Sequence, residues 1–341
     1  MDIERVFEAV PLLDQAFKEC RVCLNDVYAR AQEVIVSPVG TPPEFEVSCG
    51  GIPPGMLSLR RNLFSSFFQA TYGLLAVPEE RRFLYGKINY LFRIWVTSAD
   101  NLLDDEDKLV MDLRMGGESH VMRQVVSIMA ADRILQGILD DAVWRKTITA
   151  AGARYMLNAT LQVLLPSAAE EASEEAGVDR SLAPEYVLST IHRIKTGILF
   201  LLPLLGPEHM EQHVDRRRLA LCREGLGDFG IGCQLLDDVR DIARDHFEHR
   251  HNYVISVMAR ASGQEFSRLN MLPEMNVAKK VFRQFPDAGA VTVELAERYL
   301  RQGLIKMDAC GLGLGQQGID AVTGFMFKAL DVEEALSWAR N

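Results

Sequence analysis

The chain has 341 residues, of which 48% are hydrophobic and 25% charged, and its formal net charge is −10 at pH 7. This much apolar material is enough for a sizeable core, while the acidic balance and the absence of a basic stripe argue against a nucleic-acid-binding protein. An anionic ligand would therefore need metal ions, or local arginine and lysine side chains, to reverse the field at its site.

The chain begins with an acidic stretch rather than a signal peptide. Its longest strongly apolar run, residues 197–206, is too short for a bilayer, which takes roughly 20 residues. We therefore expect a soluble, cytoplasmic protein without a membrane span. Of the six cysteines, Cys20 and Cys23 have CxxC spacing, but no second pair or nearby histidine completes a zinc site. We expect reduced, mostly buried cysteines.

Apolar residues recur every three or four positions along most of the chain, which indicates amphipathic helices and almost no strands. The expected helical segments are, in chain order, 2–36, 56–76, 79–108, 118–140, 142–165, 184–205, 213–248, 252–262, 285–310 and 315–339. Between them, residues 37–54 are rich in proline and glycine, 166–184 predict a mobile acidic surface loop, and 311–318 a glycine-rich turn. No linker divides the chain, so we expect one all-α domain over residues 1–341.

The first acidic cluster, residues 100–107, ends one of these helices. Asp100 and Asp104 are four apart and share a helix face, where like charges cost about 0.2–0.5 kcal/mol per pair. Mg²⁺ is commonly held by one or two carboxylates together with waters and substrate phosphate oxygens, and this pair matches that need. The alternative interpretation is a solvated acidic helix end.

The second acidic cluster follows glycine-rich, apolar helical turns, which predict close packing against another helix. Its members at successive steps of four are Asp237, Asp241 and Asp245, and Gln234 and Asp238 lie close to the same stripe. Because an uncompensated buried carboxylate costs several kcal/mol, three of them predict a metal site. The alternative is an acidic helix neutralised by Arg240 and Arg244.

Between the clusters, Arg193, Lys195 and Thr196 precede a wholly apolar stretch. These side chains can bind phosphate oxygens, the arginine through its planar fork and the lysine as a point charge. The alternative is a pair of cations that extend from a helix surface into water. Gly197 would allow a close approach or a kink, and Pro203 is expected to break the helix.

Residues 230–241 read Gly-x-x-x-Gln-x-x-Asp-Asp-x-x-Asp, which resembles the second aspartate-rich motif of trans-prenyl diphosphate synthases. Lys195-Thr196-Gly197 resembles their Lys-Thr helix, and Asp100-Asn101-x-x-Asp104 resembles their first aspartate-rich motif with Asn in the second place. The resemblance covers roughly residues 55–255. It implies the isoprenoid synthase fold, a bundle of long helices around a central apolar cavity, and favours a homodimer. It also implies that the two motifs face each other and hold three Mg²⁺ ions, which bind the diphosphate of an allylic prenyl diphosphate substrate.

The residues and the resemblance together assign three roles. The metal ligands would be Asp100, Asp104, Asp237, Asp241 and Asp245, of which the first four are also the expected catalytic residues. The diphosphate would be bound by Arg193, Lys195, Thr196, Arg240 and Arg244. Gln234 and Asp238 would orient the metal ligands.

Departures from the resemblance decide which branch we expect. Chain-elongating members carry an Arg-Arg pair after the first motif and an N-terminal lysine, and neither is present in the matching stretches here. Terpene synthases share the fold without a second-substrate site, so we expect a Mg²⁺-dependent class I terpene synthase that ionises an allylic prenyl diphosphate and cyclises or quenches the cation. One alternative is a chain-elongating or coupling prenyltransferase with an unconventional second site built from Arg60, Arg61 and Arg114. Another is a non-catalytic member of the family that binds a catalytic subunit or a lipid diphosphate.

Overall fold

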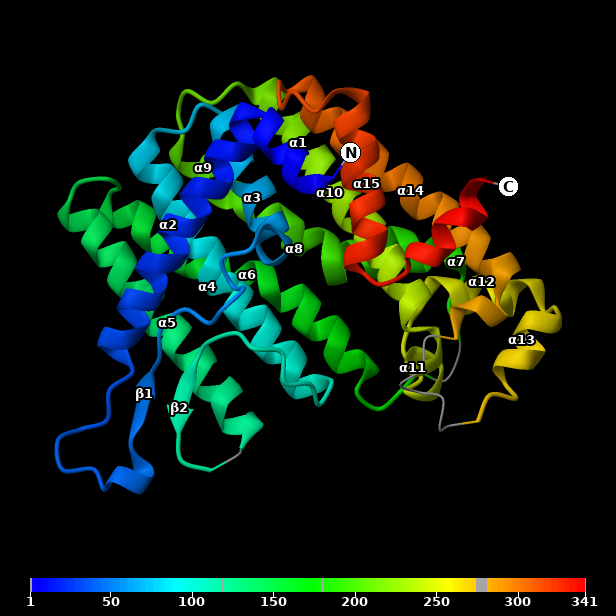
Figure 1. The fold of residues 1–341 in the computed structure, drawn as a ribbon, viewed down its shortest axis with the longest axis horizontal. Helices are drawn as coiled ribbons and strands as arrows, with labels where there is room; N and C mark the ends of the chain where they lie inside the picture. Colours follow the sequence, from blue (N-terminus) through cyan, green and yellow to red (C-terminus); the bar gives the residue numbers. More distant parts are fainter. Residues whose placement is uncertain (1, 118, 179–180, 274–280, 341) are drawn as a thin grey trace. The chain divides into compact units, whose positions relative to one another are not determined.

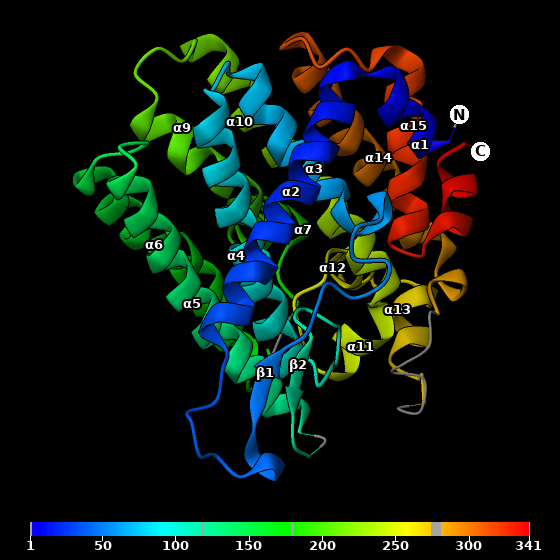
Figure 2. The same ribbon diagram turned by 60° about the vertical axis from the view of Figure 1, so that its left-hand side comes forward.

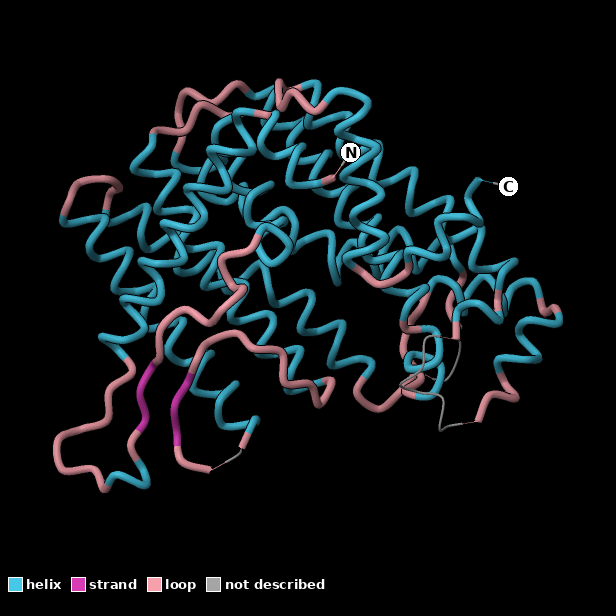
Figure 3. Tube along the Cα trace, viewed as in Figure 1, coloured by secondary structure: helices cyan, strands magenta, loops and turns pink. Residues whose placement is uncertain are grey.

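The described part of the protein is all-α, as predicted, apart from two short strands (Figure 3). The computed structural model describes residues 2–117, 119–178, 181–273 and 281–340, with the backbone alone for 338–340. The α-helices are α1 (Ile3–Ala9), α2 (Pro11–Val34), α3 (Leu59–Leu74), α4 (Glu79–Leu103), α5 (His120–Trp144), α6 (Ala150–Glu174), α7 (Pro184–Tyr186), α8 (Ile198–Leu201), α9 (Leu205–Met210), α10 (Arg216–Arg240), α11 (Ile242–Phe247), α12 (Tyr253–Ala261), α13 (Gln264–Leu269), α14 (Pro286–Ala309) and α15 (Gly315–Ala329). Strands β1 (Val47–Cys49) and β2 (Leu113–Met115) pair antiparallel.

Short segments of other helix types join these elements. Two π-helical turns follow α7, η2 (Val187–Ile191) and η3 (Arg193–Gly197). The 3₁₀ segments are η1 (Pro43–Phe45), η4 (Leu202–Leu204), η6 (Phe282–Gln284) and η7 (Glu333–Arg340). Pro203 lies in η4, and the chain returns to an α-helix directly afterwards, so this proline distorts the helix rather than ending it.

The largest error in the sequence prediction concerns the loop expected at residues 166–184. The structure continues α6 through Pro166 to Glu174, while residues 179–180 lie outside the described part of the chain. Alanine and glutamate, which made this stretch resemble a surface loop, are strong helix formers. Two of its glutamates, Glu170 and Glu174, are buried, which an acidic composition alone does not indicate.

Other predicted helices have different ends in the structure. The segment 2–36 divides before Pro11, because proline suits the first turn of a helix and favours an extended residue before it. Helix α4 ends at Leu103, five residues early, and Asp105 then adopts a left-handed φ of 50°. The segment 213–248 divides at Asp241, which joins α10 to α11.

The contacts of the chain form two compact units. Unit 1 comprises Met1–Val6, Thr160–Leu204 and Arg216–Asn341, and unit 2 comprises Phe7–Ala159 and Leu205–Asp215. The single domain over residues 1–341 stays a prediction. One helical stretch, Pro184–Met210, is long and apolar enough to cross a membrane by length and composition, and 44% of its most apolar window is buried within the protein.

In unit 2, the helices α2, α4 and α5 pack side by side (Figure 1). The buried face of α2 includes both cysteines of the CxxC pair, and all six cysteines of the chain are free and buried, as expected. The buried carboxylate of Glu19 accepts a hydrogen bond of 2.6 Å from Arg82 Nη2 and another of 2.6 Å from Gln69 Nε2. These bonds satisfy a charge that would otherwise oppose packing.

In unit 1, α10 packs closely against α14, which in turn lies beside α15 (Figure 2). A Cβ added at Gly303 of α14 would lie 2.5 Å from the carbonyl oxygen of Gly225, and one at Gly232 would lie 2.9 Å from the backbone nitrogen of Leu300. Only glycine allows these backbones to approach so closely. The glycine-rich turns before the second acidic cluster therefore pack closely against another helix, as the sequence predicted.

Candidate active site

The second acidic cluster lies at the junction of α10 and α11 in unit 1. Asp237 lies in the last turn of α10, Asp241 follows that helix, and Asp245 is buried in α11. Arg240 donates from Nε and Nη2 to Asp241 at 2.9 and 2.6 Å and also pairs with Asp237. Arg244 Nη2 donates to Asp241 at 3.0 Å. The arginines that we expected to bind diphosphate thus neutralise the expected metal ligands in this structure.

Burial perturbs two of these aspartates. Burial and, to a smaller extent, the neighbouring carboxylates together raise the pKa of Asp237 to about 6 and that of Asp245 well above its usual range. Crowding of this kind disfavours the charged forms, and a bound cation would relieve it. The oxygen donor set suits Mg²⁺. Among the described residues, however, the carboxylate oxygens of these three aspartates do not all lie close enough together to hold one metal ion.

Asp238 turns inward and is only 2% exposed. Its Oδ2 lies 2.9 Å from His192 Nε2 and accepts a hydrogen bond of 2.6 Å from the backbone nitrogen of Tyr253. Its Oδ1 accepts a bond of 3.0 Å from Gln234 Nε2. Asp238 and Gln234 therefore share one buried network, which fits the orienting role predicted for them.

Asn252 extends this network and was missed from the sequence. Its Nδ2 donates at 2.8 Å both to Asp245 Oδ2 and to the carbonyl oxygen of Asp238, while its Oδ1 accepts from Ile255 at 3.2 Å and caps α12. An asparagine directly before an apolar helical run is an N-cap signal, so the cap could have been predicted. Its contact with Asp245 could not, because it depends on the turn between α11 and α12.

The Lys-Thr segment forms the π-helical turn η3, a conformation often found at functional sites. Thr196 Oγ1 donates to Gln234 Oε1, which connects this turn to the network around Asp238. Arg193 is exposed on the same turn. The structure therefore brings Thr196 to the second acidic motif, as the expected diphosphate site requires.

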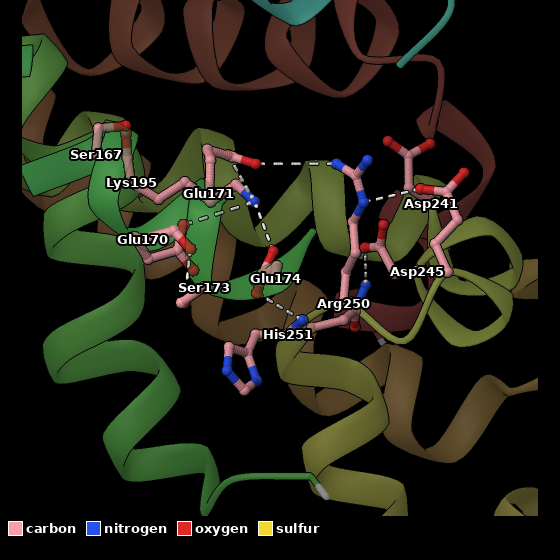
Figure 4. A network of polar contacts seen from close by, with 12 residues as sticks. Ser167, Glu170, Glu171, Ser173, Glu174, Lys195, Asp241, Asp245, Arg250 and His251 are labelled. Carbon is pink, nitrogen blue, oxygen red and sulfur yellow. Dashed lines mark hydrogen bonds and ion pairs between the residues drawn. The ribbon is translucent and has the colours of Figure 1, made fainter. Parts of the chain in front are cut away.

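Lys195 instead lies against α6, as Figure 4 shows. Its Nζ lies 2.9 Å from Glu171, 3.3 Å from Glu174 and 3.9 Å from Glu170. These three carboxylates form the group of acidic side chains in the described chain that lies close enough to hold a metal ion, and here they surround the ammonium of Lys195. Lys195 would have to leave them to reach a diphosphate.

Glu170 is the most perturbed member of this group. Burial, together with its glutamate neighbours, raises its pKa to about 8, so it is protonated in the folded protein at neutral pH. The unfolded chain loses this proton near pH 4.5, so the folded state binds more protons between pH 4.5 and 8. Glu170 therefore lowers the free energy of unfolding progressively as the pH rises through this window.

We predict that Glu170→Gln makes this dependence on pH shallower. Since glutamine cannot ionise, the variant should exceed the wild type in unfolding free energy by about 1–3 kcal/mol at pH 8 and match it near pH 5. Urea unfolding at both pH values measures the difference. Glu175→Gln, which changes an exposed glutamate one residue after α6, is the control and should leave the profile unchanged. A Glu170→Gln profile parallel to that of the wild type would contradict the prediction.

The first acidic cluster lies in unit 2, at the end of α4. Asp100 is exposed in the last turn, where a solvated ligand could be bound, and Asp104, directly after the helix, is half-buried. Asn101, between them, is fully buried and bonds to the backbone of Lys108 at 2.8 Å through Nδ2 and 3.1 Å through Oδ1. Asn101 therefore faces away from any ligand of Asp100.

A cationic pocket of about 220 Å³ lies beside this cluster within unit 2. Its lining residues are Leu24, Tyr28, Met56, Arg61, Tyr90, Arg93, Ile94, Thr97, Lys108, Leu109 and Val110. Burial lowers the pKa of Arg93, and the neighbouring guanidinium of Arg61 lowers it further. Among the described residues, neither arginine has a carboxylate partner, so the pocket is suited to an anion. Arg93 was missed from the sequence, where it is a single cation within an aromatic helix face.

Solved structures with the same fold are prenyl diphosphate synthases. A geranylgeranyl pyrophosphate synthase from Lactobacillus brevis matches with a TM-score of 0.64 and 14% identity, over 94% of this chain and 98% of that one. A heptaprenyl diphosphate synthase from Staphylococcus aureus gives 0.57 and 12%, over 92% and 98%. A geranylgeranyl pyrophosphate synthetase from Pyrococcus horikoshii gives 0.56 and 13%, over 95% and 97%. The chain therefore has the isoprenoid synthase fold, as predicted.

The sequence comparisons add no family to this structural likeness. No family model matches the chain. No curated protein matches it either. The assignment of an activity therefore depends on the residues of the two motifs and the pocket.

Proposed function

We propose that the protein is a Mg²⁺-dependent enzyme of the class I isoprenoid type, which ionises an allylic prenyl diphosphate. The observation that carries this proposal is the second acidic motif. Its three aspartates share two arginines, two of the aspartates have raised pKa values, and a buried network fixes the helix that presents them. Like charges this close to one another, with raised pKa values, favour a bound cation over a purely structural role.

Mg²⁺ would be held by the aspartates of both motifs, Asp100, Asp104, Asp237, Asp241 and Asp245. When bound, the metal would neutralise the departing diphosphate as its carbon–oxygen bond breaks. Arg240 and Arg244, which now lie on Asp241, would be freed as metal takes over that carboxylate, and their guanidinium groups would then bind diphosphate oxygens. The arginines that neutralise the aspartates in this structure would thus also be ligands of the substrate. The number of ions, three by the family resemblance, belongs to the same proposal.

The Lys-Thr turn would supply further contacts to the diphosphate. Thr196 already bonds to Gln234 of the second motif, and Arg193 is exposed on the same turn. Lys195 would join them after it leaves the glutamates of α6. Three hydrogen-bond donors on one π-helical turn suit a multiply charged anion.

The fate of the allylic group distinguishes two candidate functions. The terpene synthase expected from the sequence would cyclise or quench the cation within an apolar cavity and needs no second anionic site. The cationic pocket favours the alternative, a prenyltransferase whose second substrate also carries a diphosphate, because the two arginines that line it have no carboxylate partner among the described residues. Of the predicted second-site arginines, Arg61 lines this pocket, whereas Arg60 and Arg114 do not. A homodimer and a cytoplasmic location stay predictions.

A product assay decides between these candidates. Purified protein is incubated with Mg²⁺ and geranyl, farnesyl or geranylgeranyl diphosphate, each with and without isopentenyl diphosphate. Longer prenyl diphosphates formed only when isopentenyl diphosphate is present would establish the transfer reaction. A hydrocarbon or alcohol formed without it would establish the terpene synthase.

The pocket gives this assay a matched pair of variants. If the transfer reaction operates, Arg93→Gln should raise the KM for isopentenyl diphosphate at least tenfold, because it removes a half-buried cation from the pocket. Arg60→Ala, which removes an exposed arginine that does not line the pocket, should leave that KM unchanged. Equal effects of the two variants would contradict a role for the pocket.

A further inference from the structure

Asn101 occupies the place where the resembling motif has a second aspartate, and its surroundings explain the difference. The side chain is 0% exposed, and its two amide atoms both bond to the backbone of Lys108. Nδ2 donates to the Lys108 carbonyl oxygen at 2.8 Å, and Oδ1 accepts from the Lys108 nitrogen at 3.1 Å. This arrangement needs a group that donates and accepts at once, which an amide does and an ionised carboxylate does not.

The bonded segment forms one wall of the cationic pocket. Lys108 and the two residues after it, Leu109 and Val110, all line the pocket together with Arg61 and Arg93. Among the described residues, the segment has few other hydrogen bonds to the helices. Glu106 donates from its backbone nitrogen to the carbonyl oxygen of Asn101 at 3.0 Å, and Tyr28 donates from its hydroxyl to the carbonyl oxygen of Val110 at 3.5 Å. The amide of Asn101 is therefore the shortest direct link between α4 and this wall.

We propose that Asn101 is a positioning residue, which fixes the wall formed by Lys108, Leu109 and Val110 so that the pocket retains a diphosphate group against Arg61 and Arg93. It is not a degenerate metal ligand. The proposal rests on the second candidate function, because it assumes that the pocket takes a diphosphate. In this proposal Arg61 and Arg93 form the ion pairs with the anion, and Asn101 maintains the shape of the pocket.

Asn101→Asp separates the two roles, because they predict opposite effects. For a positioning residue, the new carboxylate would face the Lys108 carbonyl oxygen, and the wall would detach. Inorganic pyrophosphate should then bind the metal-free protein, in EDTA, at least tenfold more weakly than it binds the wild type, as measured by isothermal titration calorimetry. For a metal ligand, pyrophosphate binding in EDTA should be unchanged and the Mg²⁺ concentration for half-maximal turnover should fall. That second result would overturn the proposal.

A second pair of variants tests the hydrogen bonds between Asn101 and Lys108 by changing Lys108, and it leaves the buried residues of α4 unchanged. Lys108→Pro removes both the side chain and the backbone N–H that Asn101 accepts, whereas Lys108→Ala removes the side chain alone. Lys108→Pro should bind pyrophosphate about fivefold more weakly than Lys108→Ala, which corresponds to the loss of one hydrogen bond. Equal affinities of these two variants would overturn the proposal, even if Asn101→Asp fails to fold.

Two further measurements distinguish failure of this inference from failure of the proposed function. The titrations in EDTA need no turnover, so they stand even if no allylic diphosphate is a substrate. Arg93→Gln identifies the pocket component of pyrophosphate binding, which it should remove. If Arg93→Gln binds pyrophosphate as the wild type does, the pocket is not the diphosphate site and the inference is wrong, whatever the protein catalyses.

Discussion

Asp241→Asn is expected to reduce kcat/KM for the allylic diphosphate by about 10³-fold or more. The substitution keeps the size of the side chain but removes the charge that Arg240 and Arg244 now neutralise and that Mg²⁺ is proposed to use. The fold should survive, since these ion pairs are partly exposed and such pairs contribute roughly 0–1 kcal/mol to stability. Steady-state diphosphate release, combined with circular dichroism, measures both effects.

The control for this variant lies on the same helix. Glu224→Gln removes an exposed carboxylate of α10 that pairs with Lys306, away from the acidic motif. It should retain the activity of the wild type. If Asp241→Asn were as active as Glu224→Gln, the second motif would not hold the metal.

Asp238→Ala, in contrast to Asp241→Asn, is expected to destabilise the fold strongly. Asp238 is 2% exposed and satisfies His192, Gln234 and the backbone of Tyr253. Removing its carboxylate leaves these buried donors without their acceptor, which should lower the free energy of unfolding by about 3 kcal/mol or more. Chemical denaturation at neutral pH measures this loss.

Asp237→Ala, one residue earlier, is the matched control. Asp237 belongs to the proposed metal site, and burial raises its pKa, so its charge does not stabilise the fold. Its loss should change the free energy of unfolding by less than about 1 kcal/mol while abolishing turnover. If both variants lost the same free energy of unfolding, the proposed roles, Asp237 as a metal ligand and Asp238 as a structural acid, would be wrong.

The parts of the site that could be predicted from sequence are those set by helical periodicity. The spacing of four placed Gln234 beside Asp238, and the glycine-rich turns of α10 predicted its close approach to α14. The same periodicity predicted most helices but not their ends, because a single proline or a left-handed residue sets where a helix stops.

The parts that could not be predicted depend on contacts between distant segments. Lys195 was expected at a diphosphate, but it lies among glutamates of α6 in a stretch whose composition resembled a loop. His192 could not be assigned because its partner, Asp238, is far away in the sequence. In the sequence, Asn101 is only a departure from the first motif, since the sequence does not show that the chain returns Lys108 to its side chain.

The most direct test of the central claim is whether purified wild-type protein releases diphosphate from an allylic prenyl diphosphate only when Mg²⁺ is present. Geranyl, farnesyl and geranylgeranyl diphosphates should each be incubated with Mg²⁺ or with EDTA, and both diphosphate and organic-extractable product measured. We predict that at least one of them yields both products with Mg²⁺ and neither with EDTA. Equal release with Mg²⁺ and EDTA, or no release from any of the three with or without isopentenyl diphosphate, would contradict the claim that these aspartates form a metal-dependent ionisation site.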